Sequence, residues 1–188
     1  MKKQILFLLT FLSLIPTAYS AAGLHVGLGF PYVTQYGLNL TMGQKWTLNA
    51  QYNLLDLSGG DTEIKLSMPE IGIQWHPFSG VFFLGLGVGQ QSLDVSATDT
   101  DTGESASASV TSATTIAKVG WIWGRANEGF WFGMDIAFIS PSSSDVEIET
   151  SDSLLTTSQE YKDVEEAGEA FGSTSYANFT FARFGYLF

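Results

Sequence analysis

Residues 180–188 read TFARFGYLF, and this stretch decides the fold class. Counting back from Phe188, every second residue belongs to one set: Phe188, Tyr186, Phe184, Ala182 and Thr180. A period of two is the side-chain repeat of a β-strand with two different faces. Apolar residues on one face and polar residues such as Arg183 on the other are typical of a strand in a membrane β-barrel. We therefore expect this set to face lipid and the residues between to face an interior.

Further segments of the sequence alternate in the same way. They are residues 24–30, 35–42, 46–54, 64–76, 82–91, 113–123 and 130–139. With the C-terminal segment they make eight predicted strands. The predicted fold is all-β: a transmembrane, antiparallel, up-and-down β-barrel that forms one domain. Pro69 cannot donate a ladder hydrogen bond, so we expect a bulge or a loosening of the fourth strand there.

The predicted connections alternate in length. Short links at 43–45, 77–80 and 124–129 interleave with connections at 31–34, 56–63, 96–107 and 141–172. In outer-membrane barrels the short turns lie in the periplasm and the longer loops outside the cell. This pattern predicts both the topology and a location in the Gram-negative outer membrane.

The N-terminal segment reads as a secretory signal peptide. Lys2 and Lys3 precede an apolar run over 5–15, which is followed by Pro16 and small residues over 18–22. Cleavage after Ser20 would leave residues 1–20 as the signal peptide and 21–188 as the barrel domain. A transmembrane helix is the weaker alternative, because a helix needs about 20 apolar residues to cross a bilayer. The sequence has no Cys, which excludes lipoprotein anchoring and disulfides.

Charged residues at interior positions suggest a network of ion pairs. Counted from the short-turn ends of their strands, four of them lie at a similar depth: Glu70, Lys118, Asp135 and Arg183. We expect Asp135 between Lys118 and Arg183, with Glu70 reaching across. A structural plug is favoured over a gate or proton path, because buried charges need partners in any narrow lumen. Eight strands leave an interior that side chains just fill.

Interior glycines are expected to make room for interior aromatic rings. The glycines are Gly27, Gly29, Gly85, Gly87 and Gly89, and the rings are those of Phe83, Trp131, Phe179 and Phe181. A cavity that admits a ligand is the alternative. Four tryptophans on the lipid phase, near the short turns, predict an interfacial aromatic belt: Trp46, Trp75, Trp121 and Trp123.

The sequence does not favour an enzyme. The chain has only two histidines, His25 and His76, both predicted near the short-turn rim and neither in a Ser-x-His or His-x-Ser pair. A histidine base must lie within hydrogen-bond reach of its nucleophile. No catalytic, cofactor-binding or metal-binding residues are predicted.

Negative charge is concentrated in one connection. Removal of residues 1–20 leaves 6 Lys and Arg against 19 Asp and Glu, a net charge of 6 − 19 = −13. Segment 141–172 holds nine acids against Lys162. Candidate surface contacts are Asp145, Glu147, Glu149, Asp163, Glu165 and Glu166. This charge argues against a nucleic-acid partner, because the phosphates would be repelled. A solvated loop is favoured over a recognition surface for cations or a basic partner. Residues 145–150 still alternate, so a strand could extend into this connection.

The mature chain resembles the small eight-stranded outer-membrane proteins of the OmpA-transmembrane, OmpX and OmpW type, in strand count, loop alternation, aromatic belt and C-terminal aromatic residues. The resemblance implies insertion by the barrel-assembly machinery, with Phe184, Tyr186 and Phe188 as the assembly signal. It also implies contact with outer-membrane lipids and lipopolysaccharide. Some such barrels are lipid-modifying enzymes, the least favoured function here. We expect a structural or surface-interaction role, with a porin-like conduit or binding barrel for small solutes as the alternative. Monomer and homo-oligomer both stay open.

Overall fold

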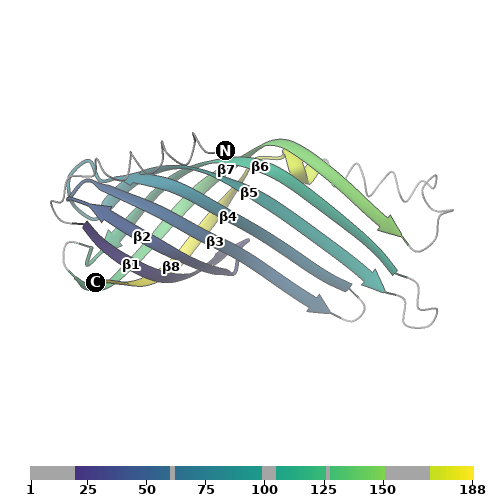
Figure 1. Ribbon diagram of the computed structural model, residues 1–188, viewed down its shortest axis with the longest axis horizontal. Helices are drawn as coiled ribbons and strands as arrows, with labels where there is room; N and C mark the ends of the chain where they lie inside the picture. Colours follow the sequence, from purple (N-terminus) through teal and green to yellow (C-terminus); the bar gives the residue numbers. More distant parts are fainter. Residues whose placement is uncertain (1–19, 60–61, 99–104, 126–127, 151–169) are drawn as a thin grey trace, which may run out of the picture.

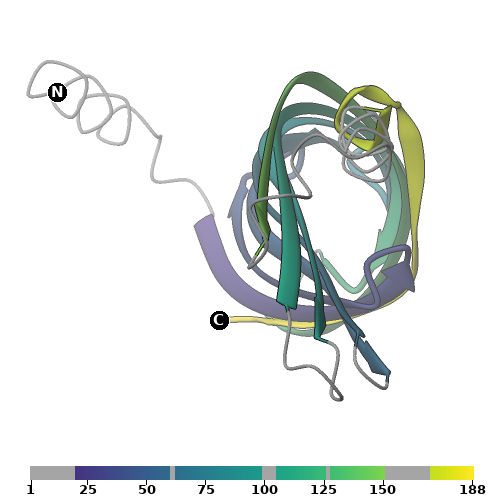
Figure 2. The ribbon, with the colours of Figure 1, turned by 90° about the vertical axis from the view of Figure 1, so that its right-hand side faces the viewer.

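The protein is a closed antiparallel β-barrel of eight strands, as the sequence predicts. The computed structural model describes residues 20–59, 62–98, 105–125, 128–150 and 170–188. The strands are β1 (Ser20–Phe30), β2 (Thr34–Met42), β3 (Trp46–Gly59), β4 (Thr62–Trp75), β5 (Phe82–Thr98), β6 (Ser105–Trp123), β7 (Gly129–Thr150) and β8 (Tyr176–Leu187). Each strand pairs with its neighbours in the chain, and β1 closes the ring against β8 (Figures 1 and 2).

Side chains in the barrel wall alternate between a lipid-type exterior and a polar interior. Along β1, Leu24, Val26 and Leu28 are more than half exposed, whereas His25 is only 4% exposed. The same alternation holds in the other strands of the barrel. An exterior of this kind buries its apolar surface in hydrocarbon instead of in a second layer of protein. Among the described residues, no helix is long and apolar enough to cross a bilayer.

β8 carries a β-bulge that the sequence pattern did not indicate. The register against β1 shifts where Leu28 pairs with Ala182 and Gly29 pairs with Thr180. One residue of β8 therefore has no partner on β1. Thr180, predicted to face lipid, is therefore buried. The phase of the strand changes at the bulge, because a bulge adds one residue to one strand of a pair.

The bulge also moves two aromatic side chains to the exterior. Phe179 and Phe181, predicted to point into the lumen, are 41% and 61% exposed. Beyond the bulge, Phe184, Tyr186 and Phe188 also face outward, and Arg183 faces inward at 1% exposure. Both halves of β8 thus present aromatic rings to lipid, with Thr180 and Arg183 inside.

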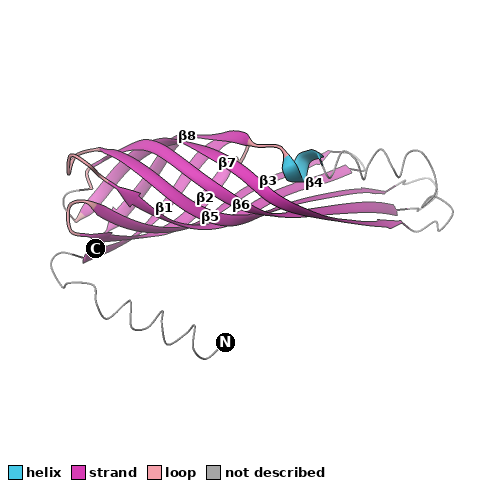
Figure 3. Ribbon diagram, turned by 90° about the horizontal axis from the view of Figure 1, so that it is seen from above, coloured by secondary structure: helices cyan, strands magenta, loops and turns pink. Residues whose placement is uncertain are grey.

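Strands β3 to β7 are longer than predicted. Three predicted connections begin too early, because β3 continues to Gly59, β5 to Thr98 and β7 to Thr150. β4 likewise begins at Thr62 and β6 at Ser105. Segment 141–150 is therefore strand and not loop, as the alternation over 145–150 suggested. Figures 1 and 3 show these strands running well past β1, β2 and β8 at one end of the barrel.

We call this extension the projecting sheet. It comprises residues 55–59, 62–66, 93–98, 105–110 and 140–150. A bulge marks its base in β7, where Ala113 pairs with Ser143 and Thr114 pairs with Pro141. At Pro69 the register of β4 does not shift, and the pairing with β5 is only interrupted over Met68 and Pro69. A local loss of pairing without a bulge accommodates Pro69, because proline lacks only the amide donor.

Two apolar clusters fill the lumen, one toward each end. Phe83, Ile122, Trp131 and Leu187 form the cluster at the short-turn end. The cluster at the other end consists of Tyr32, Leu66, Met68, Ile116, Ala137 and Ile139. A helical turn over 170–173 brings Phe171 against this second cluster. Polar and charged side chains fill the layer between the clusters.

The interior aromatic rings do not pack on the glycines predicted to receive them. A Cβ atom on Gly185 would clash with the ring of Trp131, and one on Gly120 would lie 2.6 Å from the ring of Phe83. Gly185 pairs directly with Trp131, and Gly120 pairs directly with Phe83. Each ring therefore lies over the glycine opposite it on the adjacent strand. Which glycine this is depends on the register of strand pairing.

Parts of the prediction lie outside the described residues. They are the signal peptide up to residue 19, the acidic residues Asp163, Glu165 and Glu166, and the side chain of Glu149.

Replacing Gly185 by Ala should destabilise the barrel by about 1–3 kcal/mol, because the new methyl group overpacks the lumen against Trp131. Urea unfolding in lipid vesicles, followed by tryptophan fluorescence, measures the change. Gly59→Ala is the matched control, since a Cβ atom there has no neighbour within 4 Å. Equal stability of the two variants would contradict the packing of Trp131 on Gly185.

Candidate functional site

Two ion pairs occupy the middle layer of the lumen. The first joins Lys118 on β6 to Glu70 on β4, and its side chains are 8% and 4% exposed. Asn53 on β3 donates to a Glu70 carboxylate oxygen at 3.4 Å. This pair passes over β5, whose inward positions in this region are glycines. A Cβ atom on Gly85 would lie 3.2 Å from Cβ of Lys118. The glycines of β5 therefore make room for an ion pair and not for aromatic rings.

The second ion pair joins neighbouring strands β7 and β8. Arg183 Nη2 lies 2.8 Å from Asp135 Oδ2, and both side chains are at most 2% exposed. The hydroxyl of Thr180 donates to Asp135 Oδ1 at 3.3 Å, and Arg183 Nη2 donates to Gln35 Oε1 at 3.4 Å. The bulge in β8 makes this possible, because it turns both Thr180 and Arg183 inward beside Asp135.

The four charged residues thus form two separate pairs. Sequence reasoning placed Asp135 between Lys118 and Arg183, whereas Lys118 pairs with Glu70 and Asp135 pairs with Arg183. The lumen beside Glu70 and Lys118 keeps a cavity of only about 10 Å³, no more than a single water molecule needs. Among the described residues, an apolar cluster lies toward each end of this layer.

Both histidines lie in the lumen near the short-turn end. His25 Nε2 is 3.3 Å from Gln51 Oε1, and its ring centroid lies 5.7 Å from that of Trp131. His76 is fully buried, with its ring centroid 5.8 Å from that of Phe83. Neither histidine has a serine or carboxylate among these contacts. The surroundings of both rings are those of packing residues.

The four predicted belt tryptophans lie on the exterior near the short turns. Trp46, Trp75, Trp121 and Trp123 are 37–43% exposed. The rings of Trp46 and Trp75 stack across β3 and β4, with centroids 6.3 Å apart. Amphipathic rings at such positions favour the membrane–water interface.

The projecting sheet reverses the polarity of the barrel wall. One register row runs through Leu55, Leu66, Leu93, Val110 and Val146. These side chains continue the interior face, where Leu66 and Val110 are 5% and 3% exposed. The next row toward the strand ends runs through Asp56, Lys65, Asp94, Ser109 and Glu147. It lies on the outer face, and four of its five members carry a charge.

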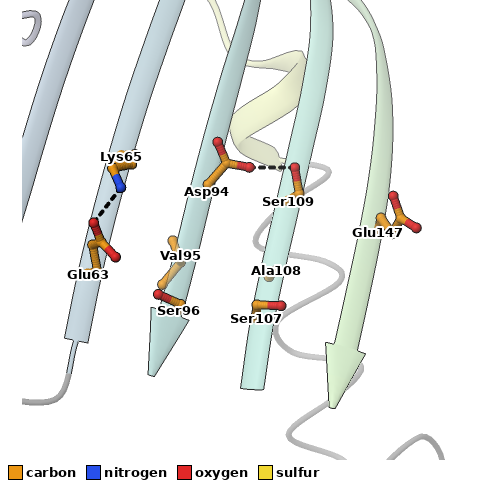
Figure 4. A pocket seen from close by; sticks show the side chains of 9 residues that line it. All are labelled: Glu63, Lys65, Asp94, Val95, Ser96, Ser107, Ala108, Ser109 and Glu147. Atoms are coloured by element: carbon orange, nitrogen blue, oxygen red, sulfur yellow. Dashed lines mark hydrogen bonds and ion pairs between the residues drawn. The ribbon is translucent and has the colours of Figure 1, made fainter. Parts of the chain in front are cut away.

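Four members of this outer row line an open hollow of about 340 Å³ on the projecting sheet: Lys65, Asp94, Ser109 and Glu147. Figure 4 shows its lining side chains on neighbouring strands. Ser109 donates to Asp94 Oδ1 at 2.7 Å, and Lys65 Nζ lies 2.5 Å from Glu63 Oε1. The hydrogen bond and charge of Glu63 raise the pKa of Lys65 above its usual range. Asp94 pairs in register with Lys65, and its charge also raises the pKa of Lys65. Three carboxylates, those of Glu63, Asp94 and Glu147, thus line the hollow against the single ammonium group of Lys65. The hollow is therefore acidic overall.

Comparison with known proteins returns structural neighbours only. No protein-family model and no curated protein sequence matches the chain. The solved structures that match include those of Acinetobacter baumannii CarO2 and CarO, each with a TM-score of 0.49 and 10% sequence identity. The match to CarO2 covers 91% of this chain and 99% of that one, and the match to CarO covers 89% and 97%.

The identification depends on the barrel itself, because a similarity of this size carries no information on function. The strand number, the antiparallel closure and the apolar exterior are together decisive. The chain has the fold of the small eight-stranded outer-membrane β-barrels. In outer-membrane barrels the short turns face the periplasm, so we expect the projecting sheet to lie on the extracellular side.

Sequence reasoning missed most of the outer row of the projecting sheet. Of its five residues it named only Glu147, and it left Asp56, Lys65, Asp94 and Ser109 unassigned. A signal was present, because the apolar phase of the fifth strand switches from Val88 to Leu93 and Val95. Such a switch of phase indicates a strand that leaves lipid and continues into water.

Replacing Asp135 by Asn should lower the stability of the barrel by about 3–5 kcal/mol, because it leaves the buried Arg183 without its counter-ion. Equilibrium unfolding in urea with the protein in lipid vesicles measures the loss. The double variant Asp135→Leu/Arg183→Met should recover most of it, since apolar side chains can replace a buried pair. The control Glu63→Gln changes an exposed carboxylate and should leave the midpoint almost unchanged. An Asp135→Asn variant as stable as this control would show that the pair does not hold the lumen.

Proposed function

We propose that this barrel has a structural and surface-interaction role, in which the closed barrel anchors the projecting sheet outside the outer membrane. The observation that carries the proposal is the reversal of polarity along β3 to β7. Below the reversal the outer face is apolar and suits lipid, and above it the outer face is charged and suits water. Strands that served only to span the bilayer would need about 9–11 residues, as β2 has, whereas β7 has 22.

The filled lumen supports this role over that of a conduit. A solute would have to displace the apolar cluster around Trp131, two buried ion pairs and the apolar cluster around Met68. Breaking one buried ion pair alone costs about 3–5 kcal/mol. Transport through this lumen would therefore need a large rearrangement of the interior.

A non-enzymatic role is part of the proposal. The described surroundings of His25 and His76 offer a glutamine amide and aromatic rings, and no nucleophile for a general base. Outer-membrane lipids and lipopolysaccharide remain the proposed surroundings of the exterior, and the barrel-assembly machinery the proposed reader of Phe184, Tyr186 and Phe188.

Purified full-length protein in planar lipid bilayers should give no steady single-channel current steps, because the lumen is closed at several levels. The closed-barrel proposal would be contradicted if the wild type gave steady current steps and Gly85→Leu or Gly87→Leu abolished them, since both changes narrow the lumen. Gly59→Leu on the projecting sheet is the control for effects outside the barrel.

A further inference from the structure

One edge of β7 is free over most of the projecting sheet. Its pairing with β6 continues to Thr150, whereas its pairing with β8 ends at Ile139 and Tyr176. In the part of the chain that the structure describes, no other strand lies against residues 140–150. Strand edges present unpaired amide and carbonyl groups that can pair with another extended chain. Figure 1 shows this stretch of β7 at the border of the projecting sheet.

The side chains along this edge alternate in chemistry. Asp145 and Glu147 are exposed on the outer face, and Val146 between them is half-buried on the inner face. Ser109 and Thr111, their partners on β6, are uncharged, so the acids are not neutralised from within the sheet. An added strand would thus meet carboxylates on one face and an apolar row on the other.

This charge pattern argues against a second copy of the chain as the occupant. Two β7 edges paired around Val146 would bring Asp145 and Glu147 of one copy against the same residues of the other. Like charges directly opposite each other destabilise a strand pair. The bulge at Ser142 and Pro141 further limits pairing at the base of the sheet. The edge therefore admits a strand that brings basic side chains.

The free edge of β3 is a poorer candidate. β2 pairs with β3 only as far as Leu54, which leaves residues 55–59 without a second neighbour. This edge has five residues against the eleven of 140–150. Its one acid, Asp56, pairs in register with Lys65 on β4, which supplies a positive charge beside it.

We propose that the free edge of β7 binds an extended polypeptide segment as an added β-strand, and that the segment alternates basic with apolar residues. The inference rests on the proposed surface-interaction role and names its mode and the chemistry of the partner. Backbone hydrogen bonds would supply affinity, as in other cases of strand addition. Asp145 and Glu147 would select the basic face of the segment, and Val146 the apolar face.

The first test uses a ten-residue peptide that alternates lysine and valine, labelled for fluorescence anisotropy and added to full-length protein in lipid nanodiscs. The double variant Asp145→Asn/Glu147→Gln should weaken binding about tenfold, the size expected when two surface ion pairs are lost. The matched double variant Glu63→Gln/Asp94→Asn removes the same charge from non-edge strands and should have a much smaller effect. A peptide that alternates glutamate and valine should not bind.

A second test establishes the geometry, and it is simple because the chain has no Cys. Glu147→Cys is oxidised with versions of the lysine–valine peptide that carry one Cys at successive positions. Strand addition predicts disulfide formation at alternate positions, because side chains of a strand point to opposite faces in turn. Asp94→Cys on the central strand β5 should give little cross-linking. Equal cross-linking at every position would overturn strand addition.

The outcomes separate the two proposals. Equal binding of the peptide to both double variants, together with loss of binding when 151–169 is deleted, would show that strand addition at β7 is wrong. The proposed surface-interaction role would then still hold, through a charged contact elsewhere. If the lysine–valine peptide does not bind at all, or the glutamate–valine peptide binds as tightly, both strand addition and contact through the acidic surface are wrong.

Discussion

The pairing of β8 with both β7 and β1 is the contact on which the rest of the structure depends. In hydrocarbon every backbone donor and acceptor must find a partner within the protein, and only closure removes the two edges of the sheet. β8 closes the ring with an irregularity, the bulge beside Ala182. Because of it, Thr180 and Arg183 both reach Asp135. Closure of the wall and neutralisation of the lumen are therefore achieved by the same short segment.

The interior depends on this closure in turn. Asp135 and Arg183 are tied to Gln35 on β2, and Glu70 and Lys118 are tied to Asn53 on β3. Polar contacts thus link β2, β7 and β8 in one group and β3, β4 and β6 in another. The glycines of β5 permit this arrangement, because a side chain at Gly85 would crowd Lys118. In a barrel of eight strands, side chains such as these are enough to fill the interior.

The projecting sheet uses the alternation of the barrel with its two faces exchanged. Within the bilayer the apolar side chains face outward, and in the projecting sheet rows such as Leu66–Leu93–Val110 face inward. Lys65, Asp94 and Glu147 then meet water on the outer face. The hydrophobic effect explains both arrangements, because the outer face has lipid beside it at one level and water at the other. The free edge of β7 lies entirely in the watery part.

Much of the barrel could be predicted from the sequence, because lipid on one side imposes a strict period of two. The strand number and the facing of residues such as Leu24, Ile71 and Phe138 follow from it. The bulge could not be predicted, since Phe179, Phe181 and Phe184 make both phases of β8 look apolar. The ion-pair partners were assigned from depth and from the adjacency of the last three strands, and neither reveals that glycines on β5 allow Lys118 to reach Glu70. The strand ends were placed too early because charged residues such as Asp94 occupy outward positions. Such residues indicate a loop if the outer face of every strand is assumed to contact lipid.

The exchange of faces along one strand is the central claim, and spin-label accessibility along β7 tests it most directly. Single cysteines replace Met134, Phe138, Asp145 and Glu147 in the cysteine-free chain, with inward Ala137 as the control. In vesicles, labels at Met134 and Phe138 should collide mainly with oxygen, which is enriched in lipid. Labels at Asp145 and Glu147 should collide mainly with a water-soluble nickel chelate. Lipid-type accessibility at Asp145 and Glu147, or no contrast between the two groups, would contradict a strand that leaves the membrane beyond the bulge at Ser142.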